Sequence, residues 1–227
     1  MTPRMILFDF DGTLADTAPD LAAAANLQRG YRGLPALDYA LLRPHASHGA
    51  RGLLKAALDI DASHADYEQC RKQFLQDYAK TMLEHAQLFA GIDELLEQLF
   101  QAATPWGIVT NKTEALTLPM VRHLGLESRC CVTVGGDTTA HTKPHPEPLL
   151  HAARQTGFLP QHCLYVGDDE RDILAGKAAG MATVAAGYGY CSLDDPERWQ
   201  ADAVVHQPAD LWPIIQRWTQ DGKIRPR

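Results

Sequence analysis

Short apolar runs alternate with helical patterns along most of the chain, and this alternation limits the possible folds more than any other feature. The runs are short enough to be buried parallel strands, which lack polar residues on both faces. They lie at 5–10, 106–110, 131–135, 163–167, 182–186 and, as a weaker candidate, 203–205. Segments with a helical period separate most of them, such as Ile92, Leu95, Leu96 and Leu99. The pattern predicts an α/β fold with a doubly wound, Rossmann-like parallel sheet.

The region 17–90 interrupts this alternation, because it holds helical patterns and no convincing strand. The pattern predicts three helices: one that begins near Pro19, a second over 51–58, and a third that Ser63 caps and that runs to Tyr78. The region is therefore predicted to be a helical insertion after the first strand.

The chain has 227 residues, which exceeds one average domain but falls short of two. We therefore expect a core domain formed by 1–16 and 91–227, and a helical cap domain formed by 17–90. Within the core, Pro119 should kink or divide the helix over 116–124, and Gly157 should end the helix that follows Lys143.

Composition excludes several classes of partner. A net charge of −7 argues against nucleic acid, because binding to a phosphate backbone depends on clustered Lys and Arg. The five cysteines show no CxxC spacing, which predicts reduced, buried thiols in place of disulfides or a zinc site. The first apolar run is interrupted by Asp9 and Asp11, so neither a signal peptide nor a membrane span is expected. We expect a cytoplasmic protein with no membrane partner.

Polar residues follow the predicted strands, where ligands bind in open α/β sheets. Asp9 and Asp11 end the first run, and alternation along a strand directs both to the same side. Asp and Gly also form ordinary turns, but a buried strand that ends in two ionisable groups needs a charge partner. Mg²⁺ fits this requirement because it prefers hard oxygen ligands.

Thr110 and Asn111 follow the second run and offer groups suited to phosphate oxygens, although such pairs are also common helix caps. Lys143 lies in a loop stiffened by three prolines, so it is either a fixed positive charge or an ordinary surface lysine.

Four acids within five residues follow the fourth run, at Asp168, Asp169, Glu170 and Asp172. One or two of them suit the dipole of the helix that begins there. A bound cation is the simplest reason for the others.

Together these segments resemble the haloacid dehalogenase-like hydrolase superfamily, in order and across nearly the whole chain. The resemblance rests on DxDGTLxD at 9–16, Thr110-Asn111, Lys143-Pro144 and GDDxxD at 167–172. The helical insertion after the first motif is similar to the superfamily's helical cap of the first type. The resemblance implies a phosphatase that works through an aspartyl-phosphate intermediate.

The resemblance also implies a role for each motif residue. Asp9 would attack phosphorus, and Asp11 would protonate the leaving group and then activate water. Thr110, Asn111 and Lys143 would hold the transferring phosphoryl group.

The same resemblance implies a Mg²⁺ site formed by Asp9, the backbone carbonyl of Asp11, and Asp168. Asp169 or Asp172 would organise coordinated water. Many family members carry Ser or Thr where Asp169 stands, so three roles stay open for this residue. It could bind the metal directly, organise metal-bound water, or cap the helix.

The cap segment 47–51 is similar to the superfamily's substrate-specificity loop, which makes Ser47 and Arg51 candidate substrate-binding residues. Arg51 suits a substrate carboxylate, or else packs along the cap surface. The cap is expected to close over the site and exclude water.

Over its length the sequence is similar to the bacterial phosphoglycolate phosphatases and, within that group, to N-acetylmuramate 6-phosphate phosphatases. The second likeness rests on segments such as 106–112 and Tyr188-Gly189-Tyr190. Both substrates carry a carboxylate, so Arg51 does not separate them. The expected partner is a small phosphorylated metabolite, 2-phosphoglycolate first, and the expected state is a monomer or homodimer.

Two other functions compete with a phosphatase. A sugar-phosphate mutase on the same scaffold differs only in returning the phosphoryl group to sugar. A non-catalytic phospho-accepting module also joins clustered aspartates with a lysine on a doubly wound sheet, but the adjacent pair Asp9 and Asp11 and the long cap disfavour it.

Overall fold

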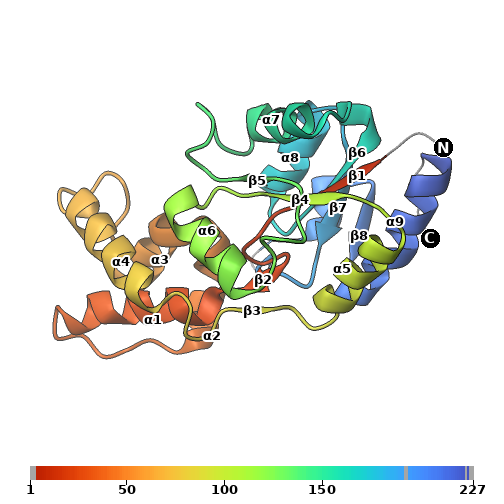
Figure 1. Ribbon diagram of the computed structural model, residues 1–227. Helices are drawn as coiled ribbons and strands as arrows, with labels where there is room; N and C mark the ends of the chain where they lie inside the picture. Colours follow the sequence, from red (N-terminus) through yellow and green to blue (C-terminus); the bar gives the residue numbers. More distant parts are fainter. Residues whose placement is uncertain (1–3, 192–193, 223, 225–227) are drawn as a thin grey trace.

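A parallel sheet forms the centre of the molecule (Figure 1). The computed structural model describes residues 4–191, 194–222 and 224. Six strands pair in the spatial order β5-β4-β1-β6-β7-β8, and every pairing is parallel. The strands are β1 (Met5–Phe8), β4 (Trp106–Val109), β5 (Thr133–Val134), β6 (Cys163–Gly167), β7 (Ala182–Ala186) and β8 (Ala203–Val205). The predicted doubly wound α/β sheet is confirmed.

Three strands are shorter than predicted, and β4 ends one residue early, at Val109. The run 131–135 forms a strand only over Thr133–Val134, although the backbone N–H of Cys131 still donates to the Trp106 carbonyl at 2.8 Å. Strand β1 ends at Phe8, although the backbone N–H of Asp9 still donates to the carbonyl of Val166 at 2.8 Å. The weaker candidate at 203–205 is strand β8.

Strand register brings the motif residues to one edge of the sheet. Phe8 of β1 lies level with Ile108 of β4 and with Val166 of β6. Because the three strands are parallel, the residues that follow them emerge side by side at their carboxyl ends. Asp9 and Asp168 therefore flank the point where the strand order reverses.

Helices cover both faces of the sheet, and the alternation along β1 decides which residues they meet (Figure 1). Ile6 and Phe8 pack in the cluster that includes residues of α5 (Ile92–Gln101), α6 (Glu114–His123) and α9 (Leu211–Asp221). Met5 and Leu7 pack in the cluster with residues of α7 (Glu147–Thr156) and α8 (Glu170–Ala178).

Two local predictions concern helix ends in the core. Gly157 adopts a left-handed conformation, with φ at 75°, directly after α7, so its predicted role as a helix end is confirmed. Pro119 lies inside α6, which continues to His123, so the helix is not divided, while the kink that was predicted as the other outcome stays a prediction. The proline removes one backbone donor, and the helix continues on both sides of it.

Four helices form the insertion between β2 and β3: α1 (Ala18–Gly30), α2 (Tyr39–Leu42), α3 (Gly49–Leu58) and α4 (Tyr67–Thr81). They pack on one another and lie apart from the sheet in Figure 1. Pro19 stands in the first turn of α1, as predicted. Ser63 does not cap α4, because its backbone N–H and hydroxyl both donate to the Asp61 carboxylate in a preceding turn.

The segment that leads from the sheet into these helices pairs with the segment that returns from them, as a short antiparallel ribbon. It pairs β2 (Ala15–Asp16) with β3 (Gln87–Leu88). No pattern in the sequence predicted this ribbon, since two residues are too few for an alternation to show. The division into a core of 1–16 and 91–227 and a cap of 17–90 stays a prediction.

Short 3₁₀ helices complete the described elements: η1 (Arg43–His48), η2 (Pro160–His162), η3 (Pro196–Trp199) and η4 (Pro208–Asp210). All five cysteines are free, but only Cys70 and Cys163 are buried and Cys131 is exposed, so the prediction that all the thiols are buried is wrong. Among the described helices, none is both long and apolar enough to cross a membrane.

Candidate active site

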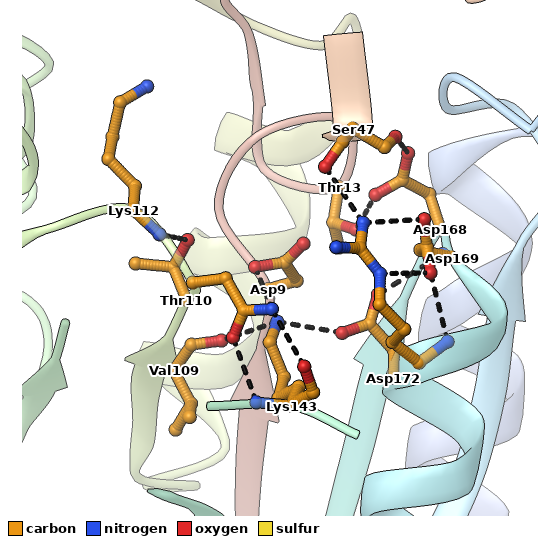
Figure 2. Close-up of polar contacts among 12 residues, drawn as sticks. Asp9, Thr13, Ser47, Val109, Thr110, Lys112, Lys143, Asp168, Asp169 and Asp172 are labelled. Atoms are coloured by element: carbon orange, nitrogen blue, oxygen red, sulfur yellow. Dashed lines mark hydrogen bonds and ion pairs between the residues drawn. The ribbon is translucent and has the colours of Figure 1, made fainter. Parts of the chain in front are cut away.

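Asp9 lies just past the end of β1 with its carboxylate buried beneath the cavity (Figure 2). The ammonium of Lys143 lies 2.8 Å from its Oδ1. This contact is an ion pair without an aligned hydrogen bond, because the buried Oδ1 accepts no hydrogen bond within the described part of the chain. Burial raises the pKa of Asp9 to about 7, and the Lys143 ammonium opposes this rise.

Asp9, Asp168 and Asp172 form a buried cluster, with one carboxylate oxygen of each within 4.8 Å of the others. Lys143 contacts two of the three acids, since its ammonium also lies 2.7 Å from Asp172 Oδ1. Burial, followed by the neighbouring charges of Asp9 and Asp172, raises the pKa of Asp168 well above its ordinary value. If all three acids were ionised, the cluster would carry more negative charge than its lysine balances, and the raised pKa values reflect that cost.

Lys143 is fixed in place by its own contacts. Its ammonium donates to the backbone carbonyl of Val109 at 3.1 Å and to the hydroxyl of Tyr165 at 2.7 Å. Burial lowers the pKa of Lys143, but Asp172 and Asp9 outweigh burial and raise it above its ordinary value. Lys143 is thus a buried, charged side chain, which excludes the alternative of a surface lysine.

Asn111 makes a contact that differs from its predicted one. Its amide oxygen accepts from the backbone N–H of Lys143 at 2.9 Å, and its amide nitrogen donates to the Lys143 carbonyl at 3.0 Å. The side chain therefore ties the Lys143 loop to the end of β4. Asn111 lines the cavity, and its predicted contact with substrate stays a prediction.

Asp168 is held by groups from three segments (Figure 2). The hydroxyl of Thr13 donates to Oδ1 at 3.1 Å, while the backbone N–H of Tyr190 and the hydroxyl of Ser47 donate to Oδ2 at 2.9 and 3.2 Å. Gly12 has φ at 86°, and a Cβ at this position would lie 2.1 Å from Oδ2. Only glycine lets the loop after β1 pack directly against this acid.

Asp169 and Asp172 have different contacts. Asp169 caps α8, and its carboxylate also pairs with the guanidinium of Arg171 at 2.7 Å. Although burial raises the pKa of Asp169, hydrogen bonds from Arg171 outweigh burial and lower it. Asp172 receives hydrogen bonds from Tyr165 and from the Asp169 backbone, so both of its oxygens have protein partners. That either acid organises metal-bound water stays a prediction.

A divalent cation fits this cluster on two observations. Three buried carboxylates converge with one ammonium among them, and the buried Oδ1 of Asp9 has the Lys143 ion pair but no hydrogen bond among the described residues. Buried charges without compensation are costly, and hard carboxylate oxygens are the ligands that Mg²⁺ prefers. Asp9 and Asp168 are the residues best placed to hold it.

Asp11 is separate from this cluster. Its Oδ1 accepts from the hydroxyl of Thr17 and lies 2.6 Å from the ammonium of Lys112. Lys112 also donates to the hydroxyl of Tyr78, which comes from α4. No role was predicted for Lys112, although its position directly after Thr110-Asn111 was a possible signal.

The cap forms one wall of a cavity of about 380 Å³ above Asp9. Of the predicted residues, all but Asp168 line it: Asp9, Asp11, Ser47, Arg51, Thr110, Asn111, Lys143, Asp169 and Asp172. Arg71 and Arg171 add positive charge, and Leu21, Phe74, Leu75 and Leu116 add an apolar surface. None of these six residues was predicted, and the four that belong to the insertion line the cavity only because of how the insertion packs.

Comparison with known proteins agrees with this geometry. A family model described as haloacid dehalogenase-like hydrolase matches residues 6–186. The chain belongs to the haloacid dehalogenase-like hydrolase family. The predicted resemblance is therefore confirmed.

Relatives of this hydrolase extend over nearly its whole length. A phosphoglycolate phosphatase of Xanthomonas campestris pv. campestris is 50% identical over 212 residues, which cover 92% of this chain and 95% of that protein. An N-acetylmuramic acid 6-phosphate phosphatase of Pseudomonas putida is 40% identical over 216 residues, which cover 95% and 97% of the two chains.

Among solved structures, one described as a predicted phosphoglycolate phosphatase from Haemophilus somnus 129PT matches with a TM-score of 0.84. It is 28% identical, and the match covers 95% of this chain and 100% of that one. These relatives confirm that the hydrolase is an enzyme of the phosphatase class.

We predict that Mg²⁺ stabilises the hydrolase through the acidic cluster. At about ten times its dissociation constant, a ligand of the folded state adds about 1.4 kcal/mol to the free energy of unfolding. The rise should appear in urea unfolding of the wild type and be absent in Asp168→Asn. Asp202→Asn, which alters an acid near β8, is the matched control and should keep the rise. Equal stabilisation of wild type and Asp168→Asn would contradict the site.

We also predict the pH dependence of the metal-free protein. The pKa of Asp9 is ordinarily 3.8 and rises to about 7 in the fold, so the folded state binds more protons between these values. Stability from this group is therefore lost as pH rises through that window. In EDTA, wild type should lose stability relative to Asp9→Asn between pH 4 and pH 7. A constant difference between the two proteins across this range would rule out the raised pKa.

Proposed function

We propose that this hydrolase is a Mg²⁺-dependent phosphomonoesterase that forms an aspartyl-phosphate on Asp9, with 2-phosphoglycolate as its substrate. One observation supports the reaction above all. The Asp9 carboxylate faces a cavity from a cluster that combines the Lys143 ammonium with two further acids. A nucleophile, a fixed positive charge and a set of metal ligands thus meet at one point.

In the first half of the reaction, an oxygen of Asp9 forms a bond to phosphorus while the bond to the leaving oxygen breaks. Asp11 gives its proton to that oxygen. Mg²⁺, when bound, neutralises charge on the phosphoryl group and on the acids. Lys143 and the Thr110 hydroxyl steady the phosphoryl oxygens, in keeping with their positions in the cavity lining.

In the second half, water attacks the aspartyl-phosphate and Asp11 takes its proton. Inorganic phosphate leaves and Asp9 is regenerated. Residues of the helical insertion line the cavity, and closure of the insertion over it would limit the access of bulk water and so support proton transfer by Asp11. A sugar-phosphate mutase would share the first half, and product analysis separates the two reactions.

The rim of the cavity supports a substrate with a carboxylate. Arg51 and Arg71 are exposed cap residues that line it, and Arg51 makes no ion pair among the described residues. A free guanidinium at this position suits bidentate binding of a carboxylate. The relative from Xanthomonas campestris is named for 2-phosphoglycolate, which carries one.

A second substrate, N-acetylmuramate 6-phosphate, is favoured by the size and chemistry of the cavity. Its volume of about 380 Å³ and its apolar wall exceed what a two-carbon acid can fill. The sugar and acetyl group of the larger compound would contact the Phe74 and Leu75 side chains. The relative from Pseudomonas putida is named for this compound. A cytoplasmic location and a monomeric or homodimeric state stay predictions from the sequence.

We predict that Asp9→Asn abolishes turnover without unfolding the protein. The amide keeps the shape of the side chain but is a poor nucleophile, so the rate should fall by at least about a thousandfold. Phosphate release and thermal unfolding are the measurements. A folded Asp9→Asn variant that still releases phosphate at the wild-type rate would exclude the aspartyl-phosphate mechanism.

We predict that Arg51 contributes to substrate selection. Loss of a hydrogen bond to a charged group costs about 1.5–3 kcal/mol, so Arg51→Gln should raise KM for the true substrate about 10- to 100-fold. The measurement is kcat and KM for 2-phosphoglycolate, N-acetylmuramate 6-phosphate and glucose 6-phosphate. The exposed Arg217 on α9 provides the control Arg217→Gln. An unchanged KM for both carboxylate substrates would remove Arg51 from the binding site.

A further inference from the structure

Three side chains from distant parts of the chain meet beside the cavity, and we call them the Asp11 latch: Asp11, Lys112 and Tyr78. The ammonium of Lys112 lies 2.6 Å from Asp11 Oδ1 and 2.8 Å from the Tyr78 hydroxyl. It also lies 4.9 Å from the centre of the Tyr78 ring. Asp11 follows β1, Lys112 follows β4 and Tyr78 belongs to α4 of the insertion. The latch therefore joins the sheet to the helical insertion.

Lys112 is enclosed to a degree that surface lysines are not. Its side chain is 7% exposed, and Tyr78 is 1% exposed. A buried ammonium is costly unless it is paired and hydrogen-bonded, and the latch supplies both an anion and a hydroxyl. Figure 2 shows the Lys112 side chain extending away from Lys143 and Asp9. Lys112 therefore serves Asp11 and not the acidic cluster.

The contacts on Asp11 fall on one oxygen. Oδ1 accepts from the Thr17 hydroxyl and from Lys112, and the described residues provide no hydrogen bond to Oδ2. Asp11 lines the cavity. Two donors on Oδ1 hold the carboxyl group in one orientation and leave the other oxygen for proton exchange.

We propose that Lys112 is a positioning residue for Asp11, and that Tyr78 makes this positioning depend on contact between the helical insertion and the sheet. The inference rests on the proposed function, in which Asp11 moves the proton. In that step the proton passes from Asp11 to the leaving oxygen as the phosphorus–oxygen bond breaks and Asp9 bonds to phosphorus. Lys112 keeps its protons throughout.

A leaving-group comparison separates positioning from other roles of Lys112. Phenyl phosphate and p-nitrophenyl phosphate both lack a carboxylate, and only the first has a leaving group basic enough to need a proton. General acid catalysis contributes about 10²–10⁴, so Lys112→Met should lower kcat/KM for phenyl phosphate about 30-fold and for p-nitrophenyl phosphate less than about 3-fold. Lys72→Met, an exposed lysine on α4, is the matched control and should change neither value.

Tyr78→Phe tests the dependence on the insertion. This substitution keeps the ring and removes the hydroxyl that accepts from Lys112, so Asp11 should be only partly misplaced. We expect kcat/KM for phenyl phosphate to fall about 5-fold, with a smaller change for p-nitrophenyl phosphate. Tyr31→Phe removes another hydroxyl of the insertion, which donates to Asp77, and should change neither substrate. Lys112→Arg should recover part of the phenyl phosphate activity. If Lys112→Met does not fold, Tyr78→Phe and Lys112→Arg decide the question.

The two levels of the proposal fail differently. If Lys112→Met lowers kcat/KM equally for both aryl phosphates, or lowers it for neither, the proposed role of the latch is wrong. An equal loss would mean that Lys112 acts through binding or general stability. Asp9→Asn in the same assay tests the reaction itself. If Asp9→Asn stays active, the proposed function fails. If Asp9→Asn is inactive and Lys112→Met shows no selectivity, only the inference on the latch fails.

Discussion

The burial of three carboxylates around one lysine is the constraint on which the site depends. Asp9, Asp168 and Asp172 converge at the carboxyl edge of the sheet, and Lys143 contacts two of them. Buried charges of one sign persist only where hydrogen bonds and counter-charges compensate them. The surrounding structure supplies part of that compensation, through the Tyr165 hydroxyl and the donors on Asp168. The negative charge of the carboxylates that these groups do not compensate is the reason to expect a bound cation.

Much of this arrangement follows from sequence, because parallel strands deliver the residues after them to a common edge. The positions of Asp9, Thr110 and Asp168 at that edge could be predicted from three apolar runs. Contacts that cross from the insertion to the sheet could not. The Ser47 hydroxyl donates to Asp168, and Arg171 donates to the Ser47 carbonyl. Neither hydrogen bond follows from a periodic pattern of residues in the sequence.

Local chemistry explains the predictions that failed. Ser63 has the side chain of a helix cap, but Asp61 offers its hydroxyl and backbone N–H a nearer acceptor, and α4 begins four residues later. Asn111 makes a contact that its motif did not predict, since both ends of its amide bind the Lys143 backbone, while its predicted contact with substrate stays a prediction. In both cases a partner outside the motif decides what the side chain does.

Asp9 and Asp11 are two residues apart and would carry out different steps of the reaction. Their different roles would result from the different side chains around each carboxyl group. Asp9 lies among buried acids, where burial raises its pKa in the metal-free protein and a cation would favour the ionised nucleophile. Asp11 faces Lys112 and Thr17 on one oxygen only. Lys143 thus pairs with Asp9 and Lys112 pairs with Asp11. Lys143 follows β5, and Lys112 follows β4. Because Lys112 also donates to the Tyr78 hydroxyl of the insertion, the acid proposed to move protons would depend on the insertion for its placement. That dependence would connect proton transfer to the enclosure of substrate, so that water is activated only in a covered site.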